Sequence, residues 1–180
     1  SRGLGDVYKR QDIDRLLAEA VKSMRLREGY RVCIVGLPNA GKSTLLNTIA
    51  KESLAITSGL PGTTRDLVRA EIDLGGVVVE FVDTAGIREN PDNDIEKEGM
   101  QRSLSAIETS NLNLLIQDIT DTNFLDMEID NCLTVMNKCD LVDDKECKRK
   151  DVLYVSSLTG KGVSELIEEI LTRLGVDEGS

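Results

Sequence analysis

One short segment, residues 36–43, constrains the fold of this chain more than any other. It reads Gly-Leu-Pro-Asn-Ala-Gly-Lys-Ser and stands between a strand-like stretch, Arg31–Val35, and a helix-like stretch, Lys42–Lys51. Successive backbone N–H groups at the start of a helix form an anion site, and the glycines let the backbone approach phosphates without clashes from Cβ atoms. The segment therefore predicts a phosphate loop of the GxxxxGKS type.

This loop assigns a role to each of its residues. The ammonium of Lys42 should reach the β- and γ-phosphates of a nucleotide, and the hydroxyl of Ser43 should ligate Mg²⁺. The residues expected around the phosphates are Asn39, Ala40, Gly41, Lys42, Ser43 and Thr44. The alternative is a chance glycine-rich turn, but the strand before the loop and the helix after it favour the phosphate loop.

A second motif, Asp83-Thr84-Ala85-Gly86, follows the apolar stretch Val77–Val82. At the carboxyl end of a sheet strand, Asp83 can join the Mg²⁺ shell, and the Gly86 N–H can contact a γ-phosphate. An ordinary strand-ending turn is the alternative. The position of the motif downstream of the phosphate loop favours the functional interpretation.

Between these motifs lies a loop rich in glycine, serine and threonine that contains Gly62-Thr63-Thr64-Arg65-Asp66. A switch threonine is needed there to complete the coordination of Mg²⁺ when a nucleoside triphosphate is bound, and we favour Thr64 over Thr63. The alternative is a surface loop in which either threonine caps a turn.

The third motif, Asn137-Lys138-Cys139-Asp140, ends another apolar stretch. The Asp140 carboxylate can accept hydrogen bonds from N1 and N2 of guanine, whereas adenine offers no matching pair of donors. Asn137 should brace the site and the stem of Lys138 should lie along the base. The remaining candidate guanine contacts are Ser156, Ser157 and Leu158, in a short loop after the last strand. The motif favours GTP over ATP.

One residue departs from the pattern of Ras-like enzymes. Ile87 follows Gly86, at the place where those enzymes carry the glutamine that orients the attacking water. We therefore expect hydrolysis to be arranged in another way.

The three motifs belong to a regular alternation of strand-like and helix-like stretches. The expected strands are Arg31–Val35, Leu67–Leu74, Val77–Val82, Leu112–Gln117, Cys132–Met136 and Val152–Val155, and the expected helices are Lys42–Lys51, Ile95–Ser110 and Val163–Leu174. Gly75-Gly76 marks a hairpin, and the stretches Thr120–Asn131 and Asp143–Asp151 leave room for short helices only. This pattern predicts an α/β, three-layer fold of the P-loop NTPase (Ras-like GTPase) class, with a mostly parallel six-stranded sheet and one antiparallel strand.

Taken together, GLPNAGKS, PGTTRD, DTAGIRE with the downstream IEKEGMQRS, and NKCD resemble the G domain of the MnmE (TrmE) family of tRNA modification GTPases. The resemblance extends from about Asp12 to Leu174. It implies GTP hydrolysis that depends on K⁺, with Asn39 as the side-chain ligand of K⁺ and backbone carbonyls from residues 55–62 as further ligands. It also implies a homodimer of G domains when GTP and K⁺ are bound.

By the same resemblance, Glu96 is the acid that positions water, and the expected catalytic residues are Glu96, Lys42 and Thr64. The alternative for Glu96 is a solvated helix face, because acids are also favoured in a first helical turn. The implied role of the parent protein is the modification of wobble uridine in tRNA together with its partner MnmG, for which a complete member carries further domains. Two alternatives remain: an Era- or Der-like ribosome-assembly GTPase, and a guanine-nucleotide switch whose hydrolysis is incidental.

Composition limits the remaining possibilities. The chain of 180 residues fits one domain, and its 22 Lys and Arg against 32 Asp and Glu give a net charge of −10, so no direct nucleic-acid binding is expected. No apolar run approaches the roughly 18 residues of a membrane span, and the four cysteines suggest reduced thiols in a cytoplasmic protein. We divide the chain into an adapter-like, non-native head (1–11), a connecting amphipathic helix capped by Asp12 (12–29), the GTPase domain (30–176) and a tail (177–180).

Overall fold

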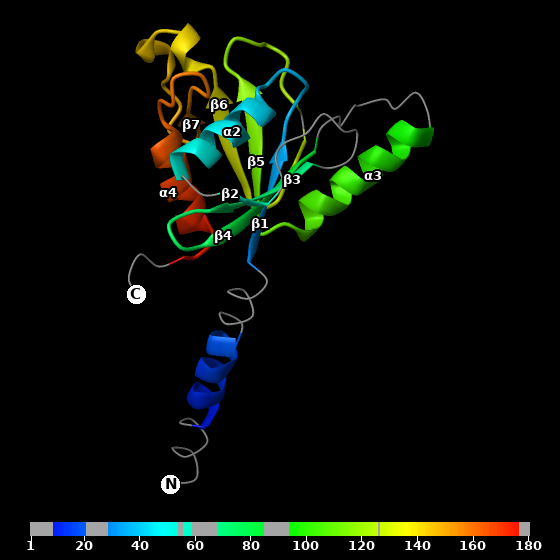
Figure 1. Ribbon diagram of the computed structural model, residues 1–180, viewed down its shortest axis with the longest axis vertical. Helices are drawn as coiled ribbons and strands as arrows, with labels where there is room; N and C mark the ends of the chain where they lie inside the picture. Colours follow the sequence, from blue (N-terminus) through cyan, green and yellow to red (C-terminus); the bar gives the residue numbers. More distant parts are fainter. Residues whose placement is uncertain are drawn as a thin grey trace.

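The computed structural model describes residues 9–20, 29–53, 56–58, 68–84, 94–125 and 127–176. Within them, strands form a single sheet with helices on both faces (Figure 1). The strands are β1 (Tyr30–Val35), β2 (Ile56–Ser58), β3 (Val68–Asp73), β4 (Val78–Asp83), β5 (Leu112–Asp118), β6 (Cys132–Asn137) and β7 (Leu153–Tyr154). The α-helices that surround the sheet are α2 (Lys42–Ser53), α3 (Asp94–Thr109) and α4 (Val163–Arg173).

The sheet confirms the predicted α/β class. Its order is β2-β3-β4-β1-β5-β6-β7, and β1 pairs in parallel with both β4 and β5, as β6 does with β5 and β7. Strand β3 is antiparallel to its neighbours β2 and β4, so it alone runs against the rest of the sheet. Strand β2 is a short additional edge strand. Its three residues are too few for a period-two pattern to be recognised in sequence.

The predicted hairpin joins β3 to β4. Gly75 and Gly76 both have positive φ, +68° and +97°, which suits a tight turn between antiparallel strands. The Leu74 N–H donates to the Val77 carbonyl at 2.8 Å, and the Gly76 N–H donates to the Asp73 carboxylate at 2.6 Å. The turn therefore fixes the register that carries Asp83 to the end of β4.

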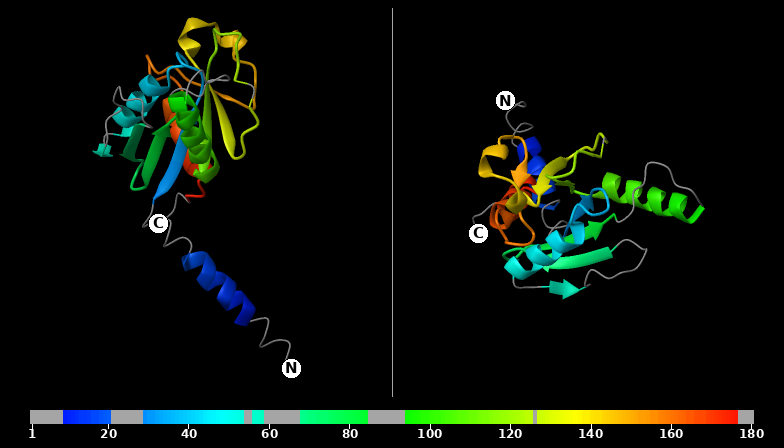
Figure 2. Two further views of the ribbon diagram at one scale, coloured as in Figure 1. Left: turned by 90° about the vertical axis from the view of Figure 1, so that its right-hand side faces the viewer. Right: turned by 90° about the horizontal axis from the view of Figure 1, so that it is seen from above.

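The two faces of the sheet are covered by different helices (Figure 2). The alternating side chains of β1 show the division: Val32 and Ile34 join the larger core under α2 and α4, whereas Cys33 and Val35 join a smaller core under α3. Strands covered on both faces are apolar along their whole length, which is why the sequence marks β1 and β5 so clearly. All four cysteines of the chain are free thiols.

One region differs from the predicted helices, at the start of the chain. Residues 9–20 form a helix that includes Asp12 in its interior, so Asp12 is not its N-cap and the helix extends into the segment that we assigned to the head. Its apolar side chains Ile13, Leu16 and Leu17 are exposed, and residues 21–28 lie outside the described part of the chain. The stretch after β6 holds two 3₁₀ helices, η1 (Cys139–Leu141) and η2 (Asp144–Glu146), and η2 lies where room for a short helix only was expected. In the described residues, none of the helices has the length and apolar character of a membrane span.

Candidate functional site

The loop between β1 and α2 depends on glycine at two positions. A Cβ atom on Gly36 would lie 2.4 Å from the Ile116 carbonyl oxygen. Gly41 has φ of +87°, and a Cβ atom there would lie 2.4 Å from Nδ2 of Asn137. The loop can therefore lie against β5 and against Asn137 only because these residues have no side chain.

Lys42, the first residue of α2, is buried under this loop. Its side chain is 7% exposed, and Nζ donates hydrogen bonds to the carbonyls of Gly36 (2.6 Å) and Leu37 (3.2 Å). Burial lowers the pKa of Lys42, while the nearby Asp83 carboxylate acts in the opposite direction. The loop thus encloses a cationic side chain whose positive charge is only partly compensated.

Asp83, the last residue of β4, is 2% exposed and lies beside the start of α2. The Ser43 hydroxyl donates to Oδ2 at 3.4 Å, and Thr84 anchors the segment through its N–H (3.0 Å) and hydroxyl (2.8 Å) to the Ile34 carbonyl. Burial raises the pKa of Asp83, and Lys42 and Ser43 oppose this shift. Among the described atoms, Oδ1 has no hydrogen-bond partner.

That orphaned oxygen fits a metal ion. A buried carboxylate oxygen without a donor is costly, and a divalent cation removes this cost. Mg²⁺ takes oxygen ligands, and here a carboxylate and the Ser43 hydroxyl face the same space next to Lys42. The donor set of this structure is therefore suited to Mg²⁺.

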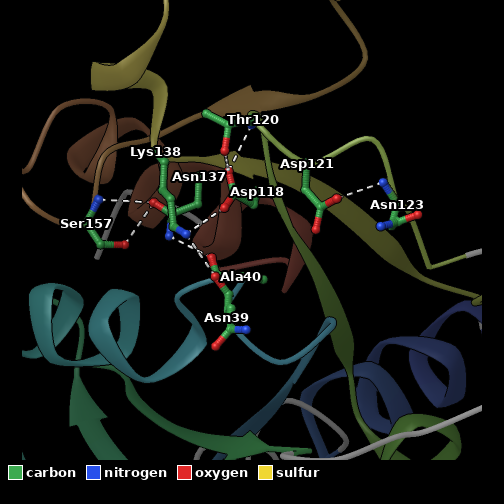
Figure 3. A network of polar contacts seen from close by, with 9 residues as sticks. All are labelled: Asn39, Ala40, Asp118, Thr120, Asp121, Asn123, Asn137, Lys138 and Ser157. Atoms are coloured by element: carbon green, nitrogen blue, oxygen red, sulfur yellow. Dashed lines mark hydrogen bonds and ion pairs between the residues drawn. The ribbon is translucent and has the colours of Figure 1, made fainter.

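Asn137, the last residue of β6, contacts two loops and is 1% exposed. Its Nδ2 donates to the Ala40 carbonyl at 2.9 Å, and its Oδ1 accepts from the N–H (3.1 Å) and the hydroxyl (2.9 Å) of Ser157, as Figure 3 shows. The side chain thus holds the phosphate loop against the loop that follows β7. This arrangement explains the requirement for glycine at position 41.

The other predicted guanine contacts lie close by. Ser156 is buried and its hydroxyl donates to Oδ1 of Asp140 at 2.7 Å, while Asp140 itself is exposed. The hydroxyl of Thr48, on α2, lies 2.7 Å from the Ser157 carbonyl oxygen and so ties this loop to the helix. Leu158 is 83% exposed and Leu141 is 63% exposed, which leaves two apolar side chains open to a flat ligand beside Asp140.

Two adjoining cavities run along these residues. One, of about 310 Å³, is lined by Pro38, Asn39, Gly41, Lys42, Ser43, Thr44 and Asp83. The other, of about 220 Å³, is lined by Gly41, Thr44, Asn137, Lys138, Asp140, Leu141, Ser157 and Leu158. Gly41 and Thr44 belong to both walls, so the cavities form one groove. One end of the groove holds the buried Lys42 and Asp83, and its other end holds Asp140.

A larger cavity, of about 420 Å³, lies between α3 and the sheet and contains none of the motif residues. Three arginines line it, but each is within ion-pair distance of a glutamate. Arg31 and Arg69 lie 3.3 and 3.7 Å from the Glu80 carboxylate, and Arg102 lies 3.0 Å from that of Glu98. Size alone therefore does not mark this cavity as the functional site.

Several predicted residues fall outside the described part of the structure. These are Thr63, Thr64, Gly86 and Ile87, together with most of the segment 55–62, of which only β2 is described. Glu96 belongs to the first turn of α3, and its side chain is likewise outside the described part. Their assigned roles stay predictions.

Two residues of the site carry no motif and were missed by sequence reasoning. Thr48, on α2, contacts Ser157 in the loop that follows β7, and Asp118, at the end of β5, contacts Lys138. A signal for Asp118 was available, because the rule that placed Asp83 and Asn137 at the carboxyl edge of the sheet applies equally to the strand between them. No comparable pattern points to Thr48.

Three features surround one groove: a glycine-dependent loop over a buried lysine, a buried carboxylate on the neighbouring strand of the sheet, and an Asn-Lys-x-Asp loop. Together they define the P-loop GTPase class. A family model described as "50S ribosome-binding GTPase" matches residues 31–145, well over half of the chain. The chain belongs to this GTPase family.

Within that family, the chain is similar to proteins named tRNA modification GTPase MnmE. That of Prochlorococcus marinus is 38% identical over 94% of this chain and 38% of its own length. That of Bordetella parapertussis is also 38% identical, over 94% of this chain and 39% of its own length. The chain thus spans about two fifths of the length of these relatives.

Among solved structures, the chain resembles Aquifex aeolicus Era bound to GDP·AlF4⁻. The TM-score is 0.63 at 27% identity, over 83% of this chain and 57% of that one. The fold is therefore shared with Era, whereas the sequence is closer to MnmE.

Proposed function

We propose that this domain binds Mg²⁺·GTP in the groove and hydrolyses it to GDP and phosphate, stimulated by K⁺. The observation that carries the proposal is the continuity of the groove through Gly41 and Thr44. It allows one ligand to meet the buried Lys42 ammonium at one end and the Asp140 carboxylate at the other. A guanosine phosphate has the required charge at one end and the required donor pair at the other.

At the phosphate end, the residues of this chain bind and orient. When a nucleotide binds, the Lys42 ammonium would leave the Gly36 and Leu37 carbonyls and contact phosphate oxygens instead. The phosphate oxygens carry negative charge, so they bind the ammonium more strongly than neutral carbonyls do. Backbone N–H groups from Asn39 to Thr44 would surround the same oxygens, for which the Ala40 N–H would leave the Leu37 carbonyl that it contacts at 3.2 Å. Ser43, Asp83 and Thr64 would hold Mg²⁺, which when bound neutralises charge on the β- and γ-phosphates.

At the hydrolytic step, this chain has Ile87 where a water-orienting glutamine would stand, so we assign that task to Glu96 at the start of α3. Asn39 is exposed at the tip of the loop with φ of +74°, and we assign its side-chain oxygen to a K⁺ ion. A cation there would supply the positive charge that an arginine finger supplies in other GTPases. Gly86 and Thr64 would sense whether the γ-phosphate is present. A G-domain homodimer would cover the K⁺ site.

The K⁺ assignment predicts an ion-specific rate. Single-turnover GTP hydrolysis in KCl should exceed that in NaCl at equal ionic strength by at least about tenfold, a small part of the ~10³–10⁵ that an arginine finger contributes. Asn39→Ala should remove the difference while GDP still binds. Asn123→Ala, an exposed asparagine in a neighbouring loop, is the control and should keep the K⁺ response. Equal rates in the two salts for the unchanged domain would contradict the assignment.

The Mg²⁺ assignment predicts that Asp83→Asn affects only the metal-dependent part of nucleotide binding. With Mg²⁺ present, the variant should bind GTP about tenfold more weakly, as expected for loss of a contact worth ~1.4 kcal/mol. With EDTA, it should match the unchanged domain within about twofold. Glu108→Gln, an exposed acid on α3, is the control. A tenfold loss that persists in EDTA would mean that Asp83 supports the fold and not the metal.

For the whole protein, we propose a part in the modification of wobble uridine in tRNA in the cytoplasm, with an MnmG partner. The similarity to MnmE proteins at 38% identity supports this role over ribosome assembly, the role that the likeness to Era would favour. The gene around this domain tests the choice. Flanking folate-binding and helical domains are expected, and an RNA-binding KH domain would favour ribosome assembly.

A further inference from the structure

Asp118 and Lys138 form an ion pair that no motif predicts. Asp118 ends β5, Lys138 follows β6, and Oδ2 of Asp118 lies 2.5 Å from Nζ of Lys138. The other carboxylate oxygen accepts from the Thr120 N–H (2.9 Å) and hydroxyl (2.7 Å). The aspartate side chain is 14% exposed and the lysine side chain 34%. Burial tends to raise the pKa of Asp118, but the hydrogen bonds from Lys138 and Thr120 outweigh it and lower the pKa below its ordinary value.

The same ammonium reaches the phosphate loop. Nζ of Lys138 donates to the Asn39 carbonyl at 2.9 Å, and Figure 3 shows Asp118, Lys138 and Asn39 in one chain of contacts. Lys138 has φ of +64°, a conformation uncommon for a residue with a side chain, so its backbone is held by the surrounding structure. The contact runs beside the bond from Asn137 to Ala40, and the two together join β6 to the loop.

We propose that Asp118 is a positioning residue that holds the Lys138 ammonium on the Asn39 carbonyl and thereby fixes the distance between the two ends of the nucleotide groove. Asp118 does not line the guanine-side cavity, whereas Lys138 does, so the carboxylate acts through the lysine. A free lysine side chain samples many rotamers, and one directed by a carboxylate loses less freedom when the nucleotide binds. The inference rests on the proposed guanine-nucleotide site.

The first measurement is the release rate of fluorescently labelled GDP, with Mg²⁺, from the whole chain. Asp118→Asn keeps an oxygen acceptor for Thr120 but removes the charge that attracts Lys138, so GDP should leave about tenfold faster. Asp121→Asn is the matched control: it makes the same change of charge in the loop that follows β5, where Asp121 accepts from the Asn123 N–H at 2.9 Å. Its release rate should stay within about twofold of the unchanged domain.

A double-variant cycle separates positioning from general stability. In a Lys138→Met background, Asp118→Asn should change GDP release by less than about twofold, because the carboxylate then has no ammonium to direct. A tenfold change in both backgrounds would show that Asp118 acts on the fold and would overturn the proposal. Thermal unfolding without nucleotide measures the fold directly. If Asp118→Asn unfolds, Thr120→Ala replaces it, with release two- to threefold faster expected and an unchanged rate contradicting the proposal.

The outcomes also separate this inference from the proposed function. If the unchanged domain does not bind labelled GDP, the nucleotide site itself is wrong. If it binds GDP and Asp118→Asn releases it at the unchanged rate, the site stands and the positioning role of Asp118 is wrong.

Discussion

Asp140→Asn is expected to lower the affinity for GDP by at least about 100-fold and to create affinity for xanthosine diphosphate. The Asp140 carboxylate only accepts hydrogen bonds, which suits the N1–H and the N2 amino group of guanine. An asparagine amide accepts one hydrogen bond and donates another. It would place its donor against the guanine amino group, whereas xanthine carries a carbonyl oxygen there and matches the amide. The Ser156 hydroxyl, 2.7 Å from Oδ1, remains able to orient the new side chain.

Competition titrations with GDP, xanthosine diphosphate and ADP measure this change. Asp143→Asn, an exposed aspartate just beyond η1, is the control and should keep the preference for GDP. If Asp140→Asn bound GDP as tightly as the unchanged domain does, the base would not face Asp140, and the assignment of the guanine end of the groove would be wrong.

Lys42→Ala is expected to slow GTP hydrolysis by about 1000-fold or more. A single preorganised hydrogen-bond donor in a buried site raises the reaction rate by a factor of about 10²–10³. Lys42 also contributes to binding of the phosphates. Without nucleotide, the fold should lose only part of its stability, because burial disfavours the charged ammonium and offsets its hydrogen bonds to the Gly36 and Leu37 carbonyls. The stabilisation that Mg²⁺·GDP gives to the folded state should instead disappear.

Single-turnover hydrolysis and thermal unfolding with and without Mg²⁺·GDP test both parts of this prediction. Lys51→Ala, an exposed lysine in the last turn of the same helix, is the control. A Lys42→Ala variant that kept more than a tenth of the rate, or the full stabilisation by Mg²⁺·GDP, would remove the lysine from the phosphate site.

Each of the six expected strands is present and begins and ends within one residue of the expected limits. The limits of β1 and β5 are the clearest in the sequence, because strands buried on both faces are apolar along most of their length. The edge strand β2 was missed because three residues cannot show a period. The helix expected from Asp12 begins earlier because helical periodicity locates a helix better than it locates its first residue.

The groove was predictable in outline for the same topological reason. β4, β1 and β6 run in parallel, so Asp83, the phosphate loop and Asn137 leave the sheet at one edge although they are far apart in sequence. What could not be predicted is how they hold one another. The clash of a Cβ at Gly41 with Asn137, the tie from Thr48 to Ser157 and the pair of Asp118 with Lys138 are contacts of the folded chain, and no local pattern encodes them.

The central claim is that one groove reads a guanine base and holds its phosphates. Isothermal titration of this chain with GDP and with ADP, both with Mg²⁺, tests it most directly. We expect one GDP per chain, bound at least about 1000-fold more tightly than ADP, because ADP would leave the Asp140 carboxylate without its donors. Equal affinity for the two nucleotides, or no binding of GDP, would contradict the claim.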